Sequence, residues 1–414
     1  MLVGHISDIH QGVGYSGPFP LSRYNDIDNI LIWTADKLIK EKVDLAVICG
    51  DMFKDAKVML DRASQEILSI VRFLRRLSSA GIEVIVISGT PSHDSISSYE
   101  LIKEMQIPRV RIYTKPEIST VEITDYHPYF NGKPNYTNYN IACLPGLNRS
   151  MLMTQDEYKG LPAEQVHRIM TDKISMLCQG MAAQMDEGKP KILMAHMTYQ
   201  NCDSGFTDLL MQNEPLLTRE ATAGFDLICL GHIHRPQIID GKVFYSGPIE
   251  RLSFNEEDIE PGFYIHEIND ISDSEWNPRA ILVESQFIET PARRYVTLDF
   301  NEEQIKNTLL YSDNPPFYFG TSIKDAIVRL KYSCSEEVAK QLNRKQLEKA
   351  LYDAGCFYVS EIKGEVQRVD RARDSSVSES LTPIQSLAKW ATNQGIDEAE
   401  ISELQSMTEE LLQC

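Results

Sequence analysis

Eight side chains able to bind a metal ion stand directly after short apolar runs of the chain. They are Asp8, His10, Asp51, His93, Asp94, His196, His232 and His234. A single histidine in such a position is more often a packed or surface residue than a ligand, but five of the nine histidines share it. Mixed carboxylate and imidazole ligands suit manganese, iron or zinc better than calcium. The pattern predicts a metal site where several strands end.

Asp51 is the candidate for a ligand that two ions share. It follows a short apolar run with no polar face, which predicts a strand buried on both sides of a sheet. Two catalytic ions lie about 3.5–4 Å apart and need a bridging ligand, which a carboxylate can supply and an imidazole cannot. Such a pair generates hydroxide near neutral pH and neutralises the charge of a phosphate. The predicted reaction class is therefore hydrolysis of a phosphate ester.

The elements that must position these residues alternate between strand and helix as far as about residue 240. Strands are predicted at 2–7, 43–50, 82–88, 191–195 and 225–230, and helices at 26–42, 61–80 and 163–187. This order predicts an α/β fold with a mainly parallel sheet and right-handed crossovers. Open α/β sheets place their chemistry at the carboxyl ends of the strands, where the candidate ligands fall.

The rest of the chain divides by composition. Asp240-Gly241 between two apolar runs predicts a β-hairpin, so the first domain, 1–275, is expected to close with antiparallel strands. A small α+β domain follows at 276–368, with one helix at 336–354. Next come a polar, Ser-rich linker at 369–380 and a helical module at 381–414. Two amphipathic helices bury their apolar stripes poorly alone, which favours docking to a partner over folding back on the chain.

Composition limits the class of protein. A chain of 414 residues is expected to form two or three domains, and no apolar run is long enough to cross a membrane. The eight cysteines are scattered without a Cys-x-x-Cys pair, which is typical of a reducing compartment. With no signal peptide visible, we expect a cytoplasmic protein. A net charge of −19 argues against coating nucleic acid by bulk electrostatics, although it leaves room for a local basic groove.

Three motifs carry a resemblance to a known family. Asp8-Ile9-His10, Gly50-Asp51 and Gly231-His232-Ile233-His234 resemble the signature of calcineurin-like metallophosphoesterases. More narrowly, the stretches 231–237 and 245–251 resemble SbcD nuclease subunits, the bacterial and phage counterparts of Mre-type break-repair nucleases. The resemblance implies a four-layer sandwich of mixed sheets flanked by helices. It also implies a small capping domain that contacts DNA, and C-terminal helices that bind a coiled-coil SbcC ATPase.

The same resemblance implies a role for each candidate ligand. Asp8, His10, Asp51 and His234 would hold a first metal ion, and Asp51, His196 and His232 a second. His93 matches the family's catalytic histidine, which orients the scissile phosphate and can protonate the leaving oxygen, and Asp94 would orient His93. The implied cofactor is a pair of Mn²⁺ ions, with Fe²⁺, Zn²⁺ or Mg²⁺ as alternatives.

One loop departs from the family pattern. The family reads Gly-Asn-His-Asp, and its asparagine binds the second metal, whereas this chain reads Gly89-Thr90-Pro91-Ser92-His93-Asp94. The missing oxygen can come from Ser92, aligned from the histidine, from Thr90, aligned from the glycine, or from water. Ser92 is the predicted ligand. The second site is expected to be the weaker one.

The leading hypothesis is a Mn-dependent DNA exonuclease and endonuclease subunit of an SbcC–SbcD type end-processing complex. It would form a homodimer and bind the ATPase through 381–414. The family implies 3′–5′ exonuclease and single-strand endonuclease activity. Weak candidates for DNA contacts are Arg235, Arg251, Arg293 and Arg294. The alternatives are a phosphoesterase for small nucleotides or phosphoproteins, and a subunit that binds DNA ends or the ATPase without cutting.

Overall fold

The computed structural model describes most of the chain. The described residues are 1–12, 17–19, 22–56, 60–91, 94–125, 135–147, 160–205, 215–270, 280–307, 322–367 and 381–412, without the side chains of 60–64, 124, 125, 135 and 136. The predicted ligands Ser92 and His93, and the predicted linker 369–380, lie outside these residues.

The first sheet contains six strands and holds the N-terminus at its centre. In order across the sheet they are β14 (Ile281–Glu289), β13 (Gly262–Asp270), β1 (Leu2–Ile6), β2 (Leu45–Cys49), β3 (Glu83–Ile87) and β4 (Val110–Tyr113). Strands β1 to β4 are parallel, whereas β13 and β14 are antiparallel additions. The carboxyl ends of β1 and β2 therefore meet at one edge.

The second sheet also has six strands. Its order is β11 (Gln237–Ile239), β12 (Val243–Tyr245), β10 (Leu227–Gly231), β7 (Lys191–His196), β6 (Asn135–Leu144) and β5 (Glu117–Asp125). The four inner strands are parallel. The predicted hairpin is confirmed: β11 and β12 pair antiparallel, and Asp240 and Gly241 have φ of 51° and 72° between them.

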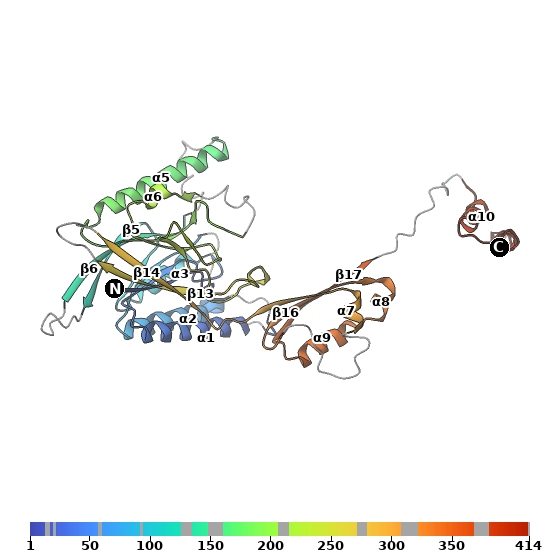
Figure 1. Ribbon diagram of the computed structural model, residues 1–414, viewed down its shortest axis with the longest axis horizontal. Helices are drawn as coiled ribbons and strands as arrows, with labels where there is room; N and C mark the ends of the chain where they lie inside the picture. Colours follow the sequence, from blue (N-terminus) through green and yellow to red (C-terminus); the bar gives the residue numbers. More distant parts are fainter. Residues whose placement is uncertain are drawn as a thin grey trace.

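Helices cover the outer face of each sheet and produce four layers (Figure 1). Helices α1 (Ser22–Lys40), α2 (Leu60–Ser79) and α3 (Ile96–Glu104) pack on the first sheet, and α5 (Ala163–Gln184) and α6 (Arg219–Thr222) on the second. A third core lies between the sheets and includes Val47, Ile85 and Met194. The predicted α/β sandwich of mixed sheets is confirmed.

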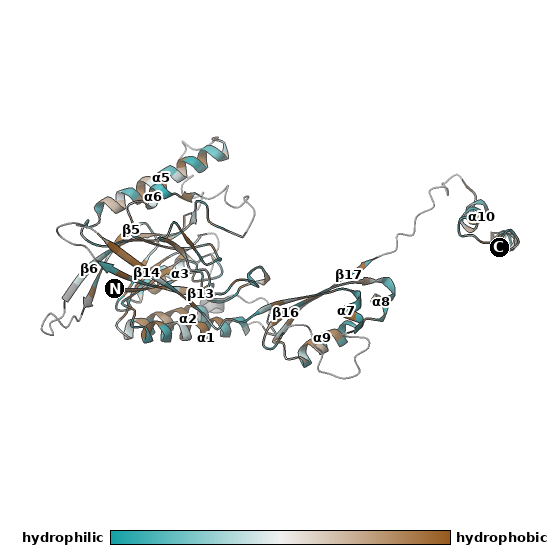
Figure 2. Cartoon of the chain, in the orientation of Figure 1, coloured by the Kyte–Doolittle hydropathy of each residue, from teal (hydrophilic) through white to brown (hydrophobic). Residues whose placement is uncertain are grey.

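Burial explains why these segments form strands. All five side chains of β2 and all five of β3 are buried, as continuous apolar runs require when both faces of a sheet are covered. Figure 2 shows hydrophobic strands inside the sandwich, while the helices alternate along their length. Short segments complete this body: β8 (Thr198–Tyr199), β9 (Leu216–Leu217) and the 3₁₀ turn η3 (Phe254–Glu256).

The sandwich extends beyond the predicted boundary at residue 275. Strand β14 pairs with β13 along its whole length, so residues 281–289 belong to the first sheet. The small domain then begins at β15 (Tyr295–Phe300), which with β16 (Ile327–Ser335) and β17 (Tyr358–Gln367) forms a parallel three-stranded sheet. The boundary at 275 was placed by composition, which does not show that the strand after it returns to pair with β13.

Helices of the small domain also differ from the prediction. Helix α7 (Glu302–Ile305) is short, and the single helix predicted at 336–354 is two helices, α8 (Glu336–Gln341) and α9 (Arg344–Asp353). Asn343 caps the second helix by accepting a hydrogen bond from the Lys345 amide. Asparagine favours a cap over a helix interior because its side chain competes for backbone donors.

Two helices end the described chain, α10 (Pro383–Asn393) and α11 (Glu398–Leu412). Thr382 and Gln385 form a capping box at the start of α10. Large apolar side chains stay exposed on both helices, with Trp390 at 47%, Met407 at 57% and Leu411 at 76%. In the part of the chain that is described, no helix combines the length and the apolar character that a membrane crossing needs.

Candidate metal centre

The first cluster of ligands lies where β1 and β10 end. Asp8 and His10 follow β1, and His234 follows β10. Their ligand atoms lie within 4.8 Å of one another. The Nε2 atoms of His10 and His234 are 3.2 Å apart, and Nε2 of His234 is 3.9 Å from Oδ1 of Asp8. Three of the four residues predicted for the first ion therefore converge on one point.

The second cluster lies beside the first, shares Asp8 with it and adds residues at the ends of β2 and β7. Asp8, Asp51 and His196 also bring ligand atoms within 4.8 Å of one another. Oδ1 of Asp51 is 3.3 Å from Nε2 of His196, while its Oδ2 is 3.7 Å from Nε2 of His10. One carboxylate thus turns one oxygen toward each cluster, which is the arrangement that a bridging ligand needs.

Nε2 of His196 is a buried atom that lacks a hydrogen-bond partner among the described residues. The other ring nitrogen, Nδ1, lies 2.8 Å from the carbonyl oxygen of Cys49 and donates to it. In the neutral ring this bond leaves the lone pair on Nε2, directed toward Asp51. Buried polar atoms are rarely left unpaired, and a ligand histidine is usually held by its second nitrogen in this way. The donor set therefore fits a bound cation.

His234 is held by a carboxylate that the sequence did not suggest. Its Nδ1 lies 2.7 Å from Oε1 of Glu256, in the 3₁₀ turn η3, so that Nε2 faces Asp8 and His10. The other oxygen of Glu256 accepts a hydrogen bond from the Leu252 amide at 2.6 Å. A carboxylate behind a ligand histidine fixes its tautomer and raises its basicity. No motif marks Glu256, because it is brought close only by the fold.

Four candidate ligands have a left-handed backbone. Asp8, His10, Asp51 and His232 have φ of 53°, 49°, 48° and 92°. Residues other than glycine adopt this region rarely, and such conformations gather at functional sites. Close packing also requires Gly89, because a Cβ there would overlap the carboxylate of Asp51. The edge of the sandwich is shaped to present these side chains.

Negative charge dominates the electrostatics of the centre. Burial alone would lower the pKa of His196, but the charges of Asp51 and Asp8 raise it to about 10. Burial likewise opposes the charged form of His234, whose pKa the hydrogen bond to Glu256 and the charge of Asp8 raise to about 9. Both rings therefore bind a proton near neutral pH when no cation is bound. A metal ion would take the place of these protons.

Asp94 is buried and holds the loop that carries the family's catalytic histidine. Its Oδ2 accepts hydrogen bonds from the Gly89 amide at 2.7 Å and from the Tyr99 hydroxyl at 2.5 Å, and its Oδ1 accepts one from the Phe53 amide at 3.2 Å. Burial and the charge of Asp51 raise the pKa of Asp94 to about 7. Its predicted action on His93 stays a prediction, since His93 lies outside the described residues.

Each arginine predicted to contact DNA already has a protein partner. Arg235 pairs with Asp203 at 2.7 Å, and the buried Arg251 pairs with Glu260 at 2.8 Å. Arg293 donates to both oxygens of Asp26, and Arg294 donates to the Ser322 carbonyl. Arg251 and Arg293 tie segments of the fold together. Their contact with DNA stays a prediction.

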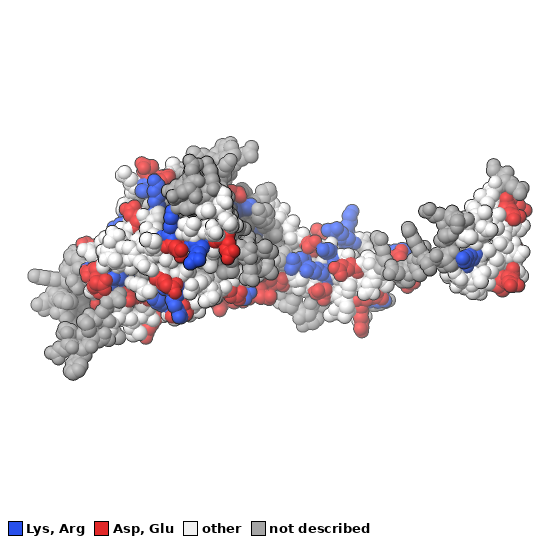
Figure 3. All heavy atoms as spheres, turned by 90° about the horizontal axis from the view of Figure 1, so that it is seen from above, with Lys and Arg blue, Asp and Glu red and all other residues white. Residues whose placement is uncertain are grey.

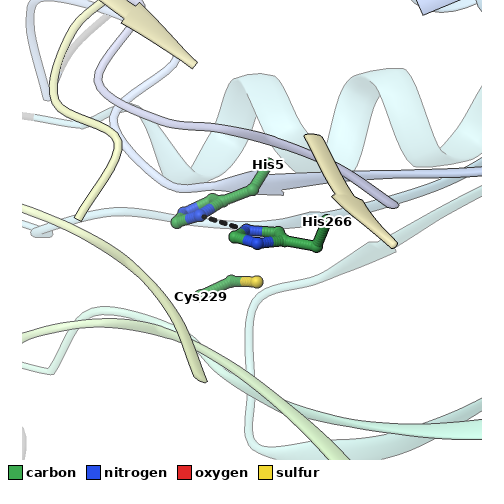
Figure 4. Close-up of side chains that lie close together, drawn as sticks. All are labelled: His5, Cys229 and His266. Carbon is green, nitrogen blue, oxygen red and sulfur yellow. Dashed lines mark hydrogen bonds between the residues drawn. The ribbon is translucent and has the colours of Figure 1, made fainter. Parts of the chain in front are cut away.

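A third group of possible ligands, His5, Cys229 and His266, lies in the core between the sheets (Figure 4). Nε2 of His5 lies 3.0 Å from the Leu230 carbonyl, and Nδ1 of His266 lies 2.7 Å from the Ser285 hydroxyl. Nε2 of His266 lies 3.5 Å from Nδ1 of His5. Burial lowers the pKa of both histidines, that of His5 to about 4. These neutral, hydrogen-bonded rings are accounted for as core residues.

Two known nuclease subunits are similar to this chain in sequence. The SbcD component of the SbcCD nuclease of Escherichia coli K12 is 24% identical over 263 residues, covering 62% of this chain and 62% of that protein. The protein of the same description from Escherichia coli O157:H7 matches equally. The chain thus spans less than two thirds of the length of these relatives. The predicted resemblance to SbcD is confirmed as sequence similarity.

Solved structures are more distant. A dimetal phosphatase from Danio rerio is 11% identical, with a TM-score of 0.35, covering 70% of this chain and 97% of that one. A protein from Thermus thermophilus is 13% identical, with a TM-score of 0.32, covering 69% and 98%. Similarity of this degree carries no argument about function.

The family itself follows from a match that spans more than half of the chain. The sequence model described as calcineurin-like phosphoesterase matches residues 1–236. This range contains Asp8, His10, Asp51, His196 and His232, together with His234. With the two clusters of ligands that the fold assembles, the match shows that the chain belongs to the calcineurin-like phosphoesterase family.

Proposed function

We propose that the protein is a Mn-dependent DNA nuclease subunit of the SbcD type, which hydrolyses phosphodiester bonds with two metal ions under the control of an SbcC-type ATPase. One observation carries the proposal. The two oxygens of the buried Asp51 lie toward two separate clusters of ligands, at 3.7 Å from His10 and 3.3 Å from His196. Similarity to a relative described as a nuclease subunit supports DNA as the substrate.

The residues that would hold the ions are those predicted from the resemblance. Asp8, His10, Asp51 and His234 would hold the first, and Asp51, His196 and His232 the second. When bound, two such ions supply hydroxide near neutral pH and neutralise charge on the phosphate.

The chain's own residues prepare this site. Glu256 and the Cys49 carbonyl fix the tautomers of His234 and His196. Asp8 accepts the His232 amide at 3.0 Å, and the His232 ring lies against that of His196, with 5.3 Å between the ring centroids.

Arg293 joins the capping domain to the sandwich. The guanidinium of Arg293 bonds to Asp26 in α1 and to the Asp325 carbonyl of the cap, and it lies 3.6 Å from the centroid of the Phe357 ring. The cap is therefore held beside the sandwich. Figure 3 shows basic side chains interspersed with acidic ones on the face in view. Contacts between single basic side chains and DNA phosphates therefore fit this surface better than a general electrostatic attraction of DNA to it.

The C-terminal helices are the evidence in favour of an ATPase partner. Trp390, Met407 and Leu411 are each about half exposed or more, which leaves an apolar surface on helices that have little core of their own. Amphipathic helices dock into apolar grooves or against other helices. We assign this surface to the ATPase, as predicted. The cap and these helices also count against the alternative of a small-nucleotide or phosphoprotein phosphoesterase.

The test uses labelled duplex DNA with Mn²⁺, with and without the ATPase. Metal-dependent degradation that Asp51→Asn and His93→Ala both abolish supports the proposal. Equal activity in the wild type and in Asp51→Asn would contradict the site. Binding to DNA or the ATPase without cleavage in any metal would instead favour the non-catalytic subunit, an alternative that the altered loop at 90–92 motivates.

A deletion tests the partner separately. Removing residues 381–414 should abolish association with the ATPase and leave hydrolysis of a simple phosphodiester unchanged, because the metal ligands lie elsewhere. A truncated chain that still binds the ATPase would overturn the docking assignment.

A further inference from the structure

The loop that departs from the family pattern places one side chain at the second cluster. Thr90 follows Gly89 at the end of β3 and is 6% exposed. Its Oγ1 lies 3.5 Å from Nδ1 of His232, and its amide donates to Oδ1 of Asp51 at 2.9 Å. Thr90 therefore contacts two of the three residues expected to hold the second ion.

The position of Thr90 is fixed by its neighbours. Asp94 accepts the Gly89 amide through its carboxylate, and its own amide donates to the Thr90 carbonyl at 2.8 Å. Gly146 packs so closely on Gly89 that a Cβ on Gly146 would overlap the Gly89 carbonyl. A β-branched side chain has few rotamers available. The hydroxyl is thus held beside His232.

The ligand that this chain lacks at the second metal site is an uncharged oxygen. The family supplies an amide oxygen, and a hydroxyl is the available substitute on Thr90. Threonine hydroxyls bind Mg²⁺ in phosphate-binding loops, so the oxygen is a competent ligand for a hard cation. It carries no charge to offset loss of a hydration water, which makes a weaker site than a carboxylate would.

We propose that Oγ1 of Thr90 is the ligand that replaces the family's asparagine at the second metal ion. The inference rests on the proposed two-metal function and differs from the sequence prediction, which chose Ser92. The amide of Thr90 contacts Asp51 and its hydroxyl contacts His232, so the side chain lies beside two of the residues expected to hold that ion.

The test is a titration of the full chain with Mn²⁺. Binding is monitored by calorimetry and by the electron paramagnetic resonance signal of free Mn²⁺. Thr90→Val keeps the shape and removes the oxygen, Thr90→Ser keeps the hydroxyl, and Thr90→Asn restores the family's amide. We expect two binding steps in the wild type. Thr90→Val should weaken only the second by roughly tenfold or more, the scale on which changes around a metal site act. Thr90→Ser and Thr90→Asn should keep it.

The first step serves as the folding control, since an unchanged first step shows that the Val variant has kept its fold. An unchanged second step in Thr90→Val would overturn the inference, as would a second step lost in Ser92→Ala but kept in Thr90→Val. These outcomes leave two-metal binding intact. A wild type that binds a single ion would instead contradict the proposed function, and the inference with it.

Discussion

The two clusters of ligands differ in what builds them. The first uses residues at the ends of β1 and β10, with Glu256 behind His234. The second uses the ends of β2 and β7 and relies on the loop at Thr90 for one contact. A site made of strand ends is fixed by the sheets, whereas a site completed by a loop changes with the loop. The first ion should therefore bind tightly and the second should be tunable.

The largest effect is expected where both clusters meet. Asp51→Asn leaves one neutral oxygen that cannot bridge, so both ions should be lost and hydrolysis should fall by more than roughly a hundredfold. Equilibrium dialysis with Mn²⁺ and a phosphodiester assay measure the two quantities. Loss of only one ion would contradict the shared role of Asp51, because it would show that Asp51 belongs to a single site.

A smaller effect should separate the first cluster from the second. Glu256→Gln can still accept the bond from His234 but removes the charge, and we expect the first ion to bind roughly 10-fold more weakly with the second unchanged. The matched control is Glu267→Gln, an exposed change on β13 that should leave both affinities as they are. Equal weakening of both ions would contradict the division into two clusters.

The pH dependence of metal binding sharpens the comparison further. With the pKa of His196 at about 10 and that of His234 at about 9, both rings are protonated across pH 6–8 without metal. Each ion must then displace about one proton, and its affinity should rise about tenfold per pH unit. Calorimetry in buffers of different ionisation enthalpy counts the protons. An affinity independent of pH would show that the rings are already neutral.

The core histidines should behave in the opposite way and leave both sites unaffected. Burial lowers the pKa of His5 to about 4 and that of His266 well below its usual value, so the unfolded chain binds more protons below pH 6.5. Stability is then full above pH 6.5 and falls as the pH approaches 4, by about 3 kcal/mol for His5 alone. Urea unfolding at several pH values measures this loss.

His266→Phe is the matching variant for that measurement. It removes one of the two titrating rings and should flatten the dependence of stability on pH between 6.5 and 4. An equally steep dependence in the variant would assign the acid sensitivity to other groups.

The sequence predicted the site through the positions where apolar runs stop. Asp51 and His196 could be found because a buried strand is easy to recognise and the residues at or just after its end lie at the sheet edge. Glu256 could not, since it reaches His234 from a 3₁₀ turn after the hairpin, 22 residues along the chain. The left-handed backbone at Asp8 and Asp51 was also hidden, because aspartate adopts this conformation more often than most residues but still in a minority of cases.

The fold shows the same division. Continuous apolar strands and amphipathic helices were predicted well, whereas β14, whose side chains alternate around an exposed surface, was missed. The break between α8 and α9 depends on a single cap at Asn343, which a periodic pattern passes over. The sequence left Thr90 and Ser92 as alternatives, because the two alignments of the loop are equivalent in the sequence.

The most direct test of the central claim is an anomalous difference map from crystals of the chain soaked in Mn²⁺. The account predicts two peaks, one on each side of the Asp51 carboxylate, the first against Asp8, His10 and His234 and the second against His196 and His232. A single peak, or two peaks of which only one touches Asp51, would contradict it.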